Sequence, residues 1–460
     1  MRRAPAPTAF AIALAIALAV ALAQGARWFH YDSGGYWYLS ETFVRDGHFS
    51  LYNFENNGMR GYAQPLLYWA LRNFGELLGT TDSLAVRVFN AAGFALIATV
   101  LAPRLAAIAW PQTDWNVTRR LVLAALLLAF WSGYMAYPLS DFPALGLGLL
   151  ALIGVSRAES PAWLLTAGLA AGLAINIRPS YALLAPVLVA LLVWSWLERR
   201  DREPLLSKRR TLTGAALLLG LAAVAIPQSA LQQRDFGGLS PLPGSSNLTQ
   251  YQYKLGLELQ RYETYLRGKG TLEYVEPRIV EIADEVNSGS VGAATYLKIV
   301  VEHPIAMGGL FLRHIVNGFD QRYTTPYIEV LETERGDFSS TWHLLLRILG
   351  FVLVFLALLR VVWPAARRSL GPAQWRWPLA LLVISLTAIP SAMDTRYVLP
   401  AYLVVWLLAV APGWRRALAE TRAGPHARQA LALGLAAAAF YAVVVFSIVS
   451  ETTDNLRLLG

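Results

Sequence analysis

Four charged residues lie beside long apolar stretches of the chain, and their types suit one kind of chemistry. They are Asp32, Asp141, Arg178 and Arg396. Charges near a bilayer are costly, so their presence there predicts a functional role. A carboxylate can accept the proton of a hydroxyl group, and arginines bind phosphate through paired hydrogen bonds. The four residues therefore predict a site that acts on a hydroxyl group and a phosphate.

Each of these residues also has a purely structural interpretation. Asp32 precedes a helical pattern and Asp141 opens an apolar run, so both carboxylates could cap helices. Arg178 and Arg396 could be interfacial anchors that extend their side chains to the membrane surface. The functional interpretation is favoured because all four are expected on the membrane face that otherwise carries few arginines.

The elements that must position these residues are membrane-spanning helices. Of the 460 residues, 56% are apolar and 15% are charged, against about 45–50% and about 25% in soluble domains. The sequence predicts an all-α polytopic membrane protein of about eleven transmembrane helices. The apolar runs are residues 8–26, 84–109, 121–137, 140–156, 162–177, 180–197, 211–229, 342–363, 377–393, 397–412 and 429–449.

The basic residues predict how these helices are oriented. The net charge is +9, but the arginines occur in short clusters between apolar runs, which is typical of membrane topology and argues against a nucleic-acid partner. If the N-terminus is cytoplasmic, every second connection is also cytoplasmic, and these connections hold nearly all of the basic residues of the short connections. These are Arg2, Arg3, Arg119, Arg120, Arg157, Arg199, Arg200, Arg202, Lys208, Arg209, Arg210, Arg360, Arg367, Arg368, Arg376, Arg415, Arg416, Arg422 and Arg428. The first run could instead be a cleaved signal peptide, which leaves the following segment outside as well.

Two long segments are expected on the outer face. Residues 1–229 are predicted to form an N-terminal transmembrane module whose first outer loop, residues 27–83, carries Asp32. Residues 230–341 form an outer, mostly helical segment, and residues 342–460 form a C-terminal transmembrane module. Within the outer segment, residues 247–287 are predicted to be helical. Residues 305–319 are predicted to form an amphipathic helix in the plane of the interface.

At these residues the chain resembles the C superfamily of polytopic glycosyltransferases, of the protein O-mannosyltransferase and aminoarabinose-transferase type. The resemblance covers roughly residues 8–200 and 375–410. It rests on motifs at residues 31–43, 65–68, 139–143, 176–179 and 396–400. Between these regions only the expected topology matches.

The resemblance implies that a sugar is transferred, with inversion, from a polyprenyl-phosphate donor to an acceptor hydroxyl of a lipid, glycan or protein. It implies a multi-pass protein of the cytoplasmic membrane whose active site faces the periplasm or cell exterior. Asp32 matches the acid that serves as the base, and Arg178 and Arg396 match cations near the lipid phosphate. Many members carry a second acid directly beside the first, whereas Ser33 follows here. Asp141 is therefore the predicted partner acid, and no metal cofactor is expected.

Further residues are predicted to bind the substrates. Tyr36 and Trp37 could tolerate the positive charge that develops on a departing sugar. Arg60 and Gln64 precede a Pro-Leu-Leu-Tyr segment and are predicted to line the pocket, and Tyr397 adjoins Arg396.

Three other functions compete with this interpretation. A secondary transporter would need paired broken spans and polar groups near the membrane centre. A ligase or polymerase of lipid-linked oligosaccharides would depend on Arg313 and His314 in the outer segment rather than on Asp32. A non-catalytic scaffold for cell-envelope assembly would give the aspartates and arginines no role.

The predicted orientation can be tested with topology reporters. Alkaline phosphatase, which is active only outside the cytoplasm, should be inactive when fused after Arg210 and active when fused after Gly270. A fluorescent protein that folds only in the cytoplasm should give the opposite pattern. An inactive phosphatase at Gly270 would contradict the sidedness on which the site assignments depend.

Overall fold

The structure is a computed structural model, and it is helical over most of its length. It describes residues 5–25, 28–58, 60–199, 204, 207–244, 246–257, 264–266, 270–274, 291–321, 324–328, 337–371, 374–391, 395–421, 426–453 and 456–459. Arg2, Arg3, Arg200, Arg202 and Arg422, all predicted to be cytoplasmic, lie outside these residues.

Within the described residues, six helical segments are long and apolar enough to cross a membrane, or seven if the bent α13–α14 pair counts as one. They comprise α1 (Pro5–Ala23), α4 (Asp82–Leu96) with η2 (Ile97–Leu101) and α5 (Ala102–Ala109), α6 (Val117–Trp131) with η3 (Ser132–Ala136), η4 (Pro179–Tyr181) with α9 (Leu184–Leu197), α10 (Lys208–Phe236) and α15 (Asp337–Val362).

Five shorter apolar helices complete the apolar part of the fold. They are α7 (Asp141–Val155), α8 (Pro161–Ile177), α17 (Arg376–Leu386), η6 (Thr395–Val398) with α18 (Leu399–Val410), and the apolar part of α20 (His426–Thr453). Each of the eleven predicted runs coincides with one of these segments or one of the six longer ones. A helical membrane protein is thereby confirmed, while the number of crossings stays a prediction.

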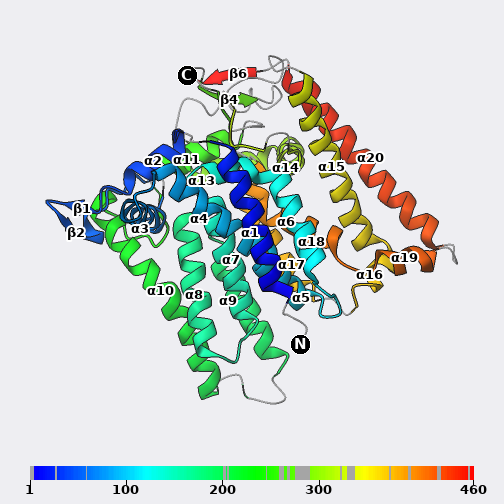
Figure 1. Cartoon of the computed structure of the whole chain (residues 1–460), viewed down its shortest axis with the longest axis horizontal. Coiled ribbons are helices and arrows are strands. Elements are labelled where there is room, and N and C mark those ends of the chain that lie inside the picture. The colour runs from blue at the N-terminus through cyan, green and yellow to red at the C-terminus, as the bar shows by residue number, and fades with distance from the viewer. Residues whose placement is uncertain are drawn as a thin grey trace.

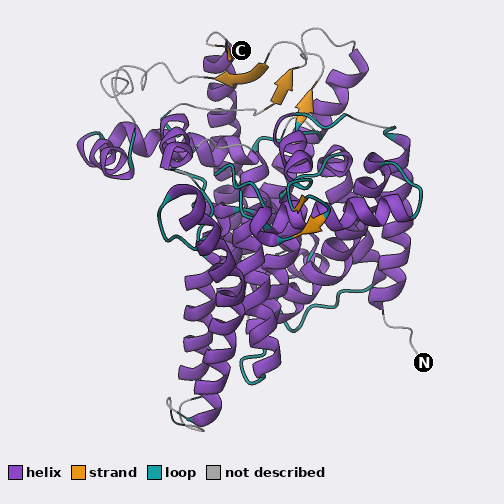
Figure 2. Cartoon of the chain, turned by 90° about the vertical axis from the view of Figure 1, so that its left-hand side faces the viewer, coloured by secondary structure: helices purple, strands orange, loops and turns teal. Residues whose placement is uncertain are grey.

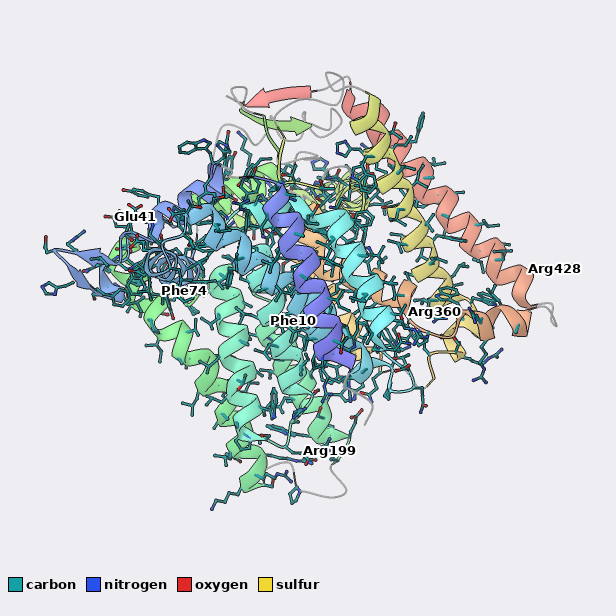
Figure 3. All side chains as sticks on the ribbon, in the orientation of Figure 1. Phe10, Glu41, Phe74, Arg199, Arg360 and Arg428 are labelled. Atoms are coloured by element: carbon teal, nitrogen blue, oxygen red, sulfur yellow. The ribbon has the colours of Figure 1, made fainter. Side chains whose placement is uncertain are left out.

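The two ends of the helices differ in character. Figure 1 shows helix α1 beginning in the lower half and strand β6 (Leu456–Leu459) at the upper end, as the predicted odd number of crossings would require. Near the upper end lie α2 (Tyr31–Leu39), α3 (Ala63–Leu77), α11 (Ser246–Leu255), α13 (Ala293–Glu302) and α14 (Pro304–Phe319). Arg199 marks the lower tip and Glu41 lies in the upper half (Figure 3). The basic 198–210 connection and the first predicted outer loop therefore lie at opposite ends. The small basic helices α16 (Pro364–Arg368) and α19 (Trp414–Thr421) are also in the lower half (Figure 1).

Part of the outer segment that was predicted to be helical forms strands. Among the described residues of 247–287, α11 is followed by β3 (Thr264–Leu266) and β4 (Gly270–Tyr274), so the prediction of a helix is wrong at these two strands. These strands join β5 (Tyr327–Ile328) and β6 (Leu456–Leu459) in a sheet of order β5-β3-β4-β6, visible at the top of Figure 2. Local periodicity cannot reveal a pairing with the distant C-terminus, and such tertiary contacts override local propensity. Residues 258–263, 267–269 and 275–290 lie outside the described residues.

Two further elements lie in the segments that were predicted to be outside. After α2 the chain forms a hairpin of β1 (Val44–Arg45) and β2 (His48–Phe49). Its turn residues Asp46 and Gly47 have φ of +53° and +74°, as a two-residue hairpin turn of this kind requires. The predicted amphipathic helix at 305–319 corresponds to α14, which meets α13 at a bend of 111°. One face of α14, with Met307 and His314, is buried in the protein.

Helices α8 and α10 pack at the closest distance that glycine permits. A Cβ added to Gly168 would lie 2.1 Å from the Leu217 carbonyl oxygen, and one added to Gly220 would lie 2.4 Å from the Leu165 carbonyl oxygen. Small residues let helix backbones approach in membranes, where van der Waals packing drives association. This contact sets the distance between the upper ends of α8 and α10, which carry Asn176 and Gln228.

The glycine contact predicts opposite effects for two similar substitutions. Gly168→Ala should lower the thermal midpoint of unfolding in detergent, because overpacking costs about 1–3 kcal/mol. Gly93→Ala is the matched control, because a Cβ there meets nothing within 4 Å and alanine favours a helix by about 1 kcal/mol. Equal midpoints in the two variants would show that the close approach is not required.

Candidate active site

Asp32 lies between two arginines that come from separate parts of the chain. Its Oδ2 is 3.9 Å from Nη2 of Arg60 and 3.8 Å from Nη1 of Arg396. Asp32 belongs to α2, Arg60 to the loop before α3, and Arg396 to η6. The side chains are only 20%, 15% and 5% exposed, respectively. Their charges therefore interact through a medium that screens less than water does.

Asp32 does not cap its helix. The N-cap of α2 is His30, whose N–H donates to Ser33 Oγ at 2.9 Å while that hydroxyl donates to the His30 carbonyl at 2.5 Å. Asp32 is the second helical residue, so the capping alternative is wrong. The preceding residue, Tyr31, has a φ of +45°. Such a conformation is costly for a residue with a Cβ and clusters at functional sites.

Asp141 and Arg178 form a second, tighter ion pair. Nη1 of Arg178 lies 2.7 Å from Oδ1 of Asp141 and donates to Ser140 Oγ at 3.1 Å. The Arg178 side chain is 6% exposed and the Asp141 side chain is 1% exposed. The sequence analysis did not predict this pairing, which gives Asp141 a partner other than Asp32. Nη2 of Arg178 and Oδ2 of Asp141 are buried without a hydrogen bond to any described residue.

Tyr397 joins the two arginines that were predicted to bind phosphate. The guanidinium carbon of Arg178 lies 4.7 Å from the centre of the Tyr397 ring, and that of Arg396 lies 5.9 Å from it. Cation–π attraction at such distances holds guanidinium groups against an aromatic face. Arg178, Arg396 and Tyr397 are thus brought together from segments more than two hundred residues apart in the chain.

Tyr36 lies beneath the same group of charges. Arg60 stands over its ring at 5.2 Å. Its hydroxyl is buried and makes no hydrogen bond to a described residue. Burial raises the pKa of Tyr36 well above its usual value, although nearby Arg60 opposes the shift. The hydroxyl therefore stays protonated at neutral pH and can donate a hydrogen bond.

Trp37 and Gln64 are placed differently. The Trp37 indole N–H donates to Asp82 Oδ2 at 3.0 Å, and Arg72 stands 5.0 Å above its ring. Trp37 therefore attaches α2 to α3 and α4. Gln64 is fully buried and its amide donates to the Tyr68 hydroxyl at 3.4 Å. Its Oε1 makes no hydrogen bond within the described part of the chain.

A buried row of amides holds the Arg60 loop, and the sequence analysis did not predict this role for them. The Asn176 side chain accepts from Ala63 N–H at 2.8 Å and donates to Gln228 Oε1 at 2.8 Å. The Asn176 carbonyl accepts from Gly61 N–H at 3.1 Å. A Cβ on Gly61 would lie 2.2 Å from Asn176 Oδ1, so only glycine fits. Arg60 is positioned through its neighbour Gly61 by the ends of α8 and α10.

Tyr327 is a second residue that sequence reasoning missed. Its hydroxyl accepts a hydrogen bond from Ser33 N–H at 3.3 Å, and its ring packs edge-on against Tyr137 at 4.6 Å. Burial raises the pKa of Tyr327, with the nearby Asp32 carboxylate adding to the shift. Tyr327 is far from Asp32 in the sequence and belongs to no recognised motif. The sequence analysis therefore had no reason to select it.

The described residues contain no group of three His, Cys, Asp or Glu side chains placed to hold a metal ion. The candidate site combines one carboxylate with three guanidinium groups and two protonated tyrosines, which belong to Asp32, Arg60, Arg178, Arg396, Tyr36 and Tyr327. This set can bind a phosphate and receive a proton beside it.

Comparison with known proteins gives one relevant similarity. No protein-family model matches the chain. Over 189 residues it is 30% identical to an undecaprenyl phosphate-alpha-4-amino-4-deoxy-L-arabinose arabinosyl transferase of Erwinia tasmaniensis. The match covers 39% of this chain and 32% of the relative. The chain thus spans about a third of the length of that transferase.

The Asp141–Arg178 pair predicts a loss of stability rather than a selective loss of chemistry. Asp141→Asn should lower the stability by about 3 kcal/mol, because it leaves a buried guanidinium without its counter-charge. Ser140→Ala removes only one hydrogen bond to the same group and should cost about 1 kcal/mol. Thermal unfolding in detergent measures both. An Asn variant as stable as the parent would favour the earlier prediction that Asp141 is catalytic.

Proposed function

We propose that this chain is a membrane glycosyltransferase that moves a sugar from a polyprenyl-phosphate donor to an acceptor hydroxyl. The proposal rests mainly on one observation, which is that the carboxylate of Asp32 lies between two arginines at the upper ends of the helices. The transferase from Erwinia tasmaniensis, whose name specifies an undecaprenyl phosphate-linked sugar, supports the class of donor. The sugar is assigned as a hexose or a pentose.

The donor phosphate is assigned to Arg60, Arg396 and the buried Nη2 of Arg178. The contacts of Asp32 with its two arginines, at 3.8–3.9 Å, are longer than the about 2.7–2.9 Å of a charge-assisted hydrogen bond. A phosphate that forms such bonds competes with Asp32 for the same cations. Donor binding therefore leaves Asp32 able to act on the acceptor. Arg178 keeps its bond to Asp141 and offers its second nitrogen.

Asp32 is assigned as the general base. The acceptor oxygen attacks the anomeric carbon as the bond from that carbon to the phosphate oxygen breaks. The hydroxyl proton passes to Asp32, and the bonding pair leaves with the phosphate. Attack from the face opposite the phosphate inverts the anomeric centre. Tyr36 and Tyr327 keep their protons at neutral pH, so they do not compete for this role. No metal cofactor is expected.

The place of the reaction is assigned to the outer side of the cytoplasmic membrane. The polyprenyl chain lies in the bilayer beside the apolar helices, and its phosphate reaches the arginines at their ends. This assignment rests on the basic residues of the short connections, which cluster at the end opposite Asp32. The acceptor is a lipid, glycan or protein of the cell envelope.

The rival functions have less support. His314, on which a ligase would depend, is fully buried and its Nδ1 lies 2.7 Å from the Ile389 carbonyl oxygen. A transporter would have corresponding broken spans in two halves of the chain. The described residues contain one sharply bent pair, α13 with α14. A non-catalytic scaffold would not need the partly buried ion pairs that Asp32 forms.

Asp32→Asn tests the proposed base. Asparagine keeps the shape of the side chain and removes its capacity to accept the proton. Transfer from a purified polyprenyl-phosphate sugar into envelope acceptors should fall by about a hundredfold or more. The protein should still accumulate, and it should bind the donor at least as well, because Asp32 no longer competes for Arg60 and Arg396.

Tyr38→Phe is a matched control on the same helix, since its side chain is 62% exposed and is not among the groups around the phosphate site. It should bind donor as the parent does. Transfer by the Asp32→Asn variant at the rate of the parent protein would refute the assignment of the base.

A further inference from the structure

A cavity of about 820 Å³ opens beside α2. The proposed function assigns no substrate to this cavity. Its walls come from α2, from the β1–β2 hairpin, from residues 52–57 and from the C-terminal end of α10. Cavities of about 300–1,000 Å³ are typical of small-molecule sites. The lining includes Gly35, Tyr38, Arg45, Tyr52, Asn53 and Arg234.

The cavity adjoins Asp32 along the helix. Gly35 lies three residues after Asp32, and residues with this spacing are neighbours on a helix surface. A Cβ on Gly35 would meet nothing within 4 Å, so the space beside it is open. The same helix therefore presents Asp32 and Tyr36 to the arginines and Gly35 and Tyr38 to the cavity.

The side chains of the cavity suit a sugar better than a peptide. Tyr38 and Tyr52 expose 62% and 60% of their surface, and such aromatic faces pack against the C–H faces of sugar rings. The Asn53 amide donates to the carbonyls of Phe43 and His48, and its Oδ1 can accept a hydrogen bond from a sugar hydroxyl. The aliphatic and phenyl groups of the lining, Leu39 and Phe54, are 4% and 0% exposed. Peptide recognition needs pockets for apolar side chains, and these two residues contribute almost none.

The charges of the cavity are already balanced. Arg234 makes a bidentate pair with Asp235, at 2.5 and 2.8 Å, and also donates to the carbonyls of Tyr52 and Phe54. Arg45 lies 3.9 Å from Glu55. The two cations of the lining are thus matched by two carboxylates. A phosphorylated ligand would have to break one of these pairs, whereas an uncharged ligand would not.

We propose that this cavity binds the acceptor and that the acceptor part which enters it is an uncharged carbohydrate. The inference rests on the proposed function, because it takes Asp32 as the group that receives the acceptor proton. A sugar stacked on Tyr38 and Tyr52 would extend a hydroxyl past Gly35 toward Asp32. The donor and acceptor then approach α2 from adjacent faces.

The test measures binding to the detergent-solubilised full chain by saturation-transfer NMR without any donor. The neutral probes are maltose, mannobiose and N,N′-diacetylchitobiose, and the competing probes are maltose 1-phosphate and a Ser/Thr-rich hexapeptide. At least one neutral disaccharide should bind, and more tightly than the phosphorylated sugar or the peptide. Gly35→Leu, which fills the open space, and Tyr52→Ala should each weaken this binding by about tenfold or more.

Matched controls lie outside the cavity. Gly93→Leu also places a side chain in open space on a helix, and Phe74→Ala also removes a half-exposed aromatic ring, 57% exposed. Figure 3 shows Phe74 in the region of α3. Both should bind the disaccharide as the parent protein does. Because no donor is present, sugar binding can succeed where transfer fails, which separates this inference from the proposed function.

Three results would overturn the proposal. One is tighter binding of the peptide or of the phosphorylated sugar than of every neutral disaccharide. Another is the same disaccharide affinity in Gly35→Leu as in Gly93→Leu. The third is the absence of binding by all three disaccharides.

Discussion

The neutralisation of three arginines at the upper ends of the helices is the constraint on which the rest of the site depends. Arg60, Arg178 and Arg396 are mostly buried, and two carboxylates stand against them. Asp141 is bound tightly to Arg178, while Asp32 is shared between the other two at longer distances. A buried ion pair that loses one partner is strongly destabilising, so Asp141 is committed to the fold. Asp32 is held more loosely and is more exposed. In the function that we propose it is the group available for chemistry, and the excess of positive charge in the group serves the donor phosphate.

This arrangement requires that distant segments end at the same place. The glycine contact between α8 and α10 fixes the separation of Asn176 and Gln228. Asn176 in turn holds Gly61, and with it the loop that carries Arg60. Two residues after Asn176, just past the end of α8, the chain reaches Arg178. The packing of two helices inside the apolar region is thereby transmitted to the charges at their ends through hydrogen bonds that are shielded from water.

Helix α2 connects the two sites that we propose. One side of it carries Asp32 and Tyr36 against the arginines, and another side carries Gly35 and Tyr38 against the cavity. Its orientation is fixed at three points: the His30–Ser33 cap, the bond of Ser33 to Tyr327, and the bond of Trp37 to Asp82. A short helix with so few residues has little stability of its own, so these contacts determine where the carboxylate points.

The sequence by itself determined the helical membrane character, the positions of the apolar helices and the grouping of Asp32, Arg178 and Arg396 at one end of them. These follow from hydropathy and from the distribution of arginines, which are local properties of the chain. Only the tertiary structure decided that Asp141 pairs with Arg178, that Trp37 faces Asp82, that His30 rather than Asp32 caps α2, and that residues 264–274 form strands. Each of these depends on a partner far along the chain or on the backbone conformation at one residue. Hydropathy records how buried a residue is, and it carries no information about which polar group will lie beside it.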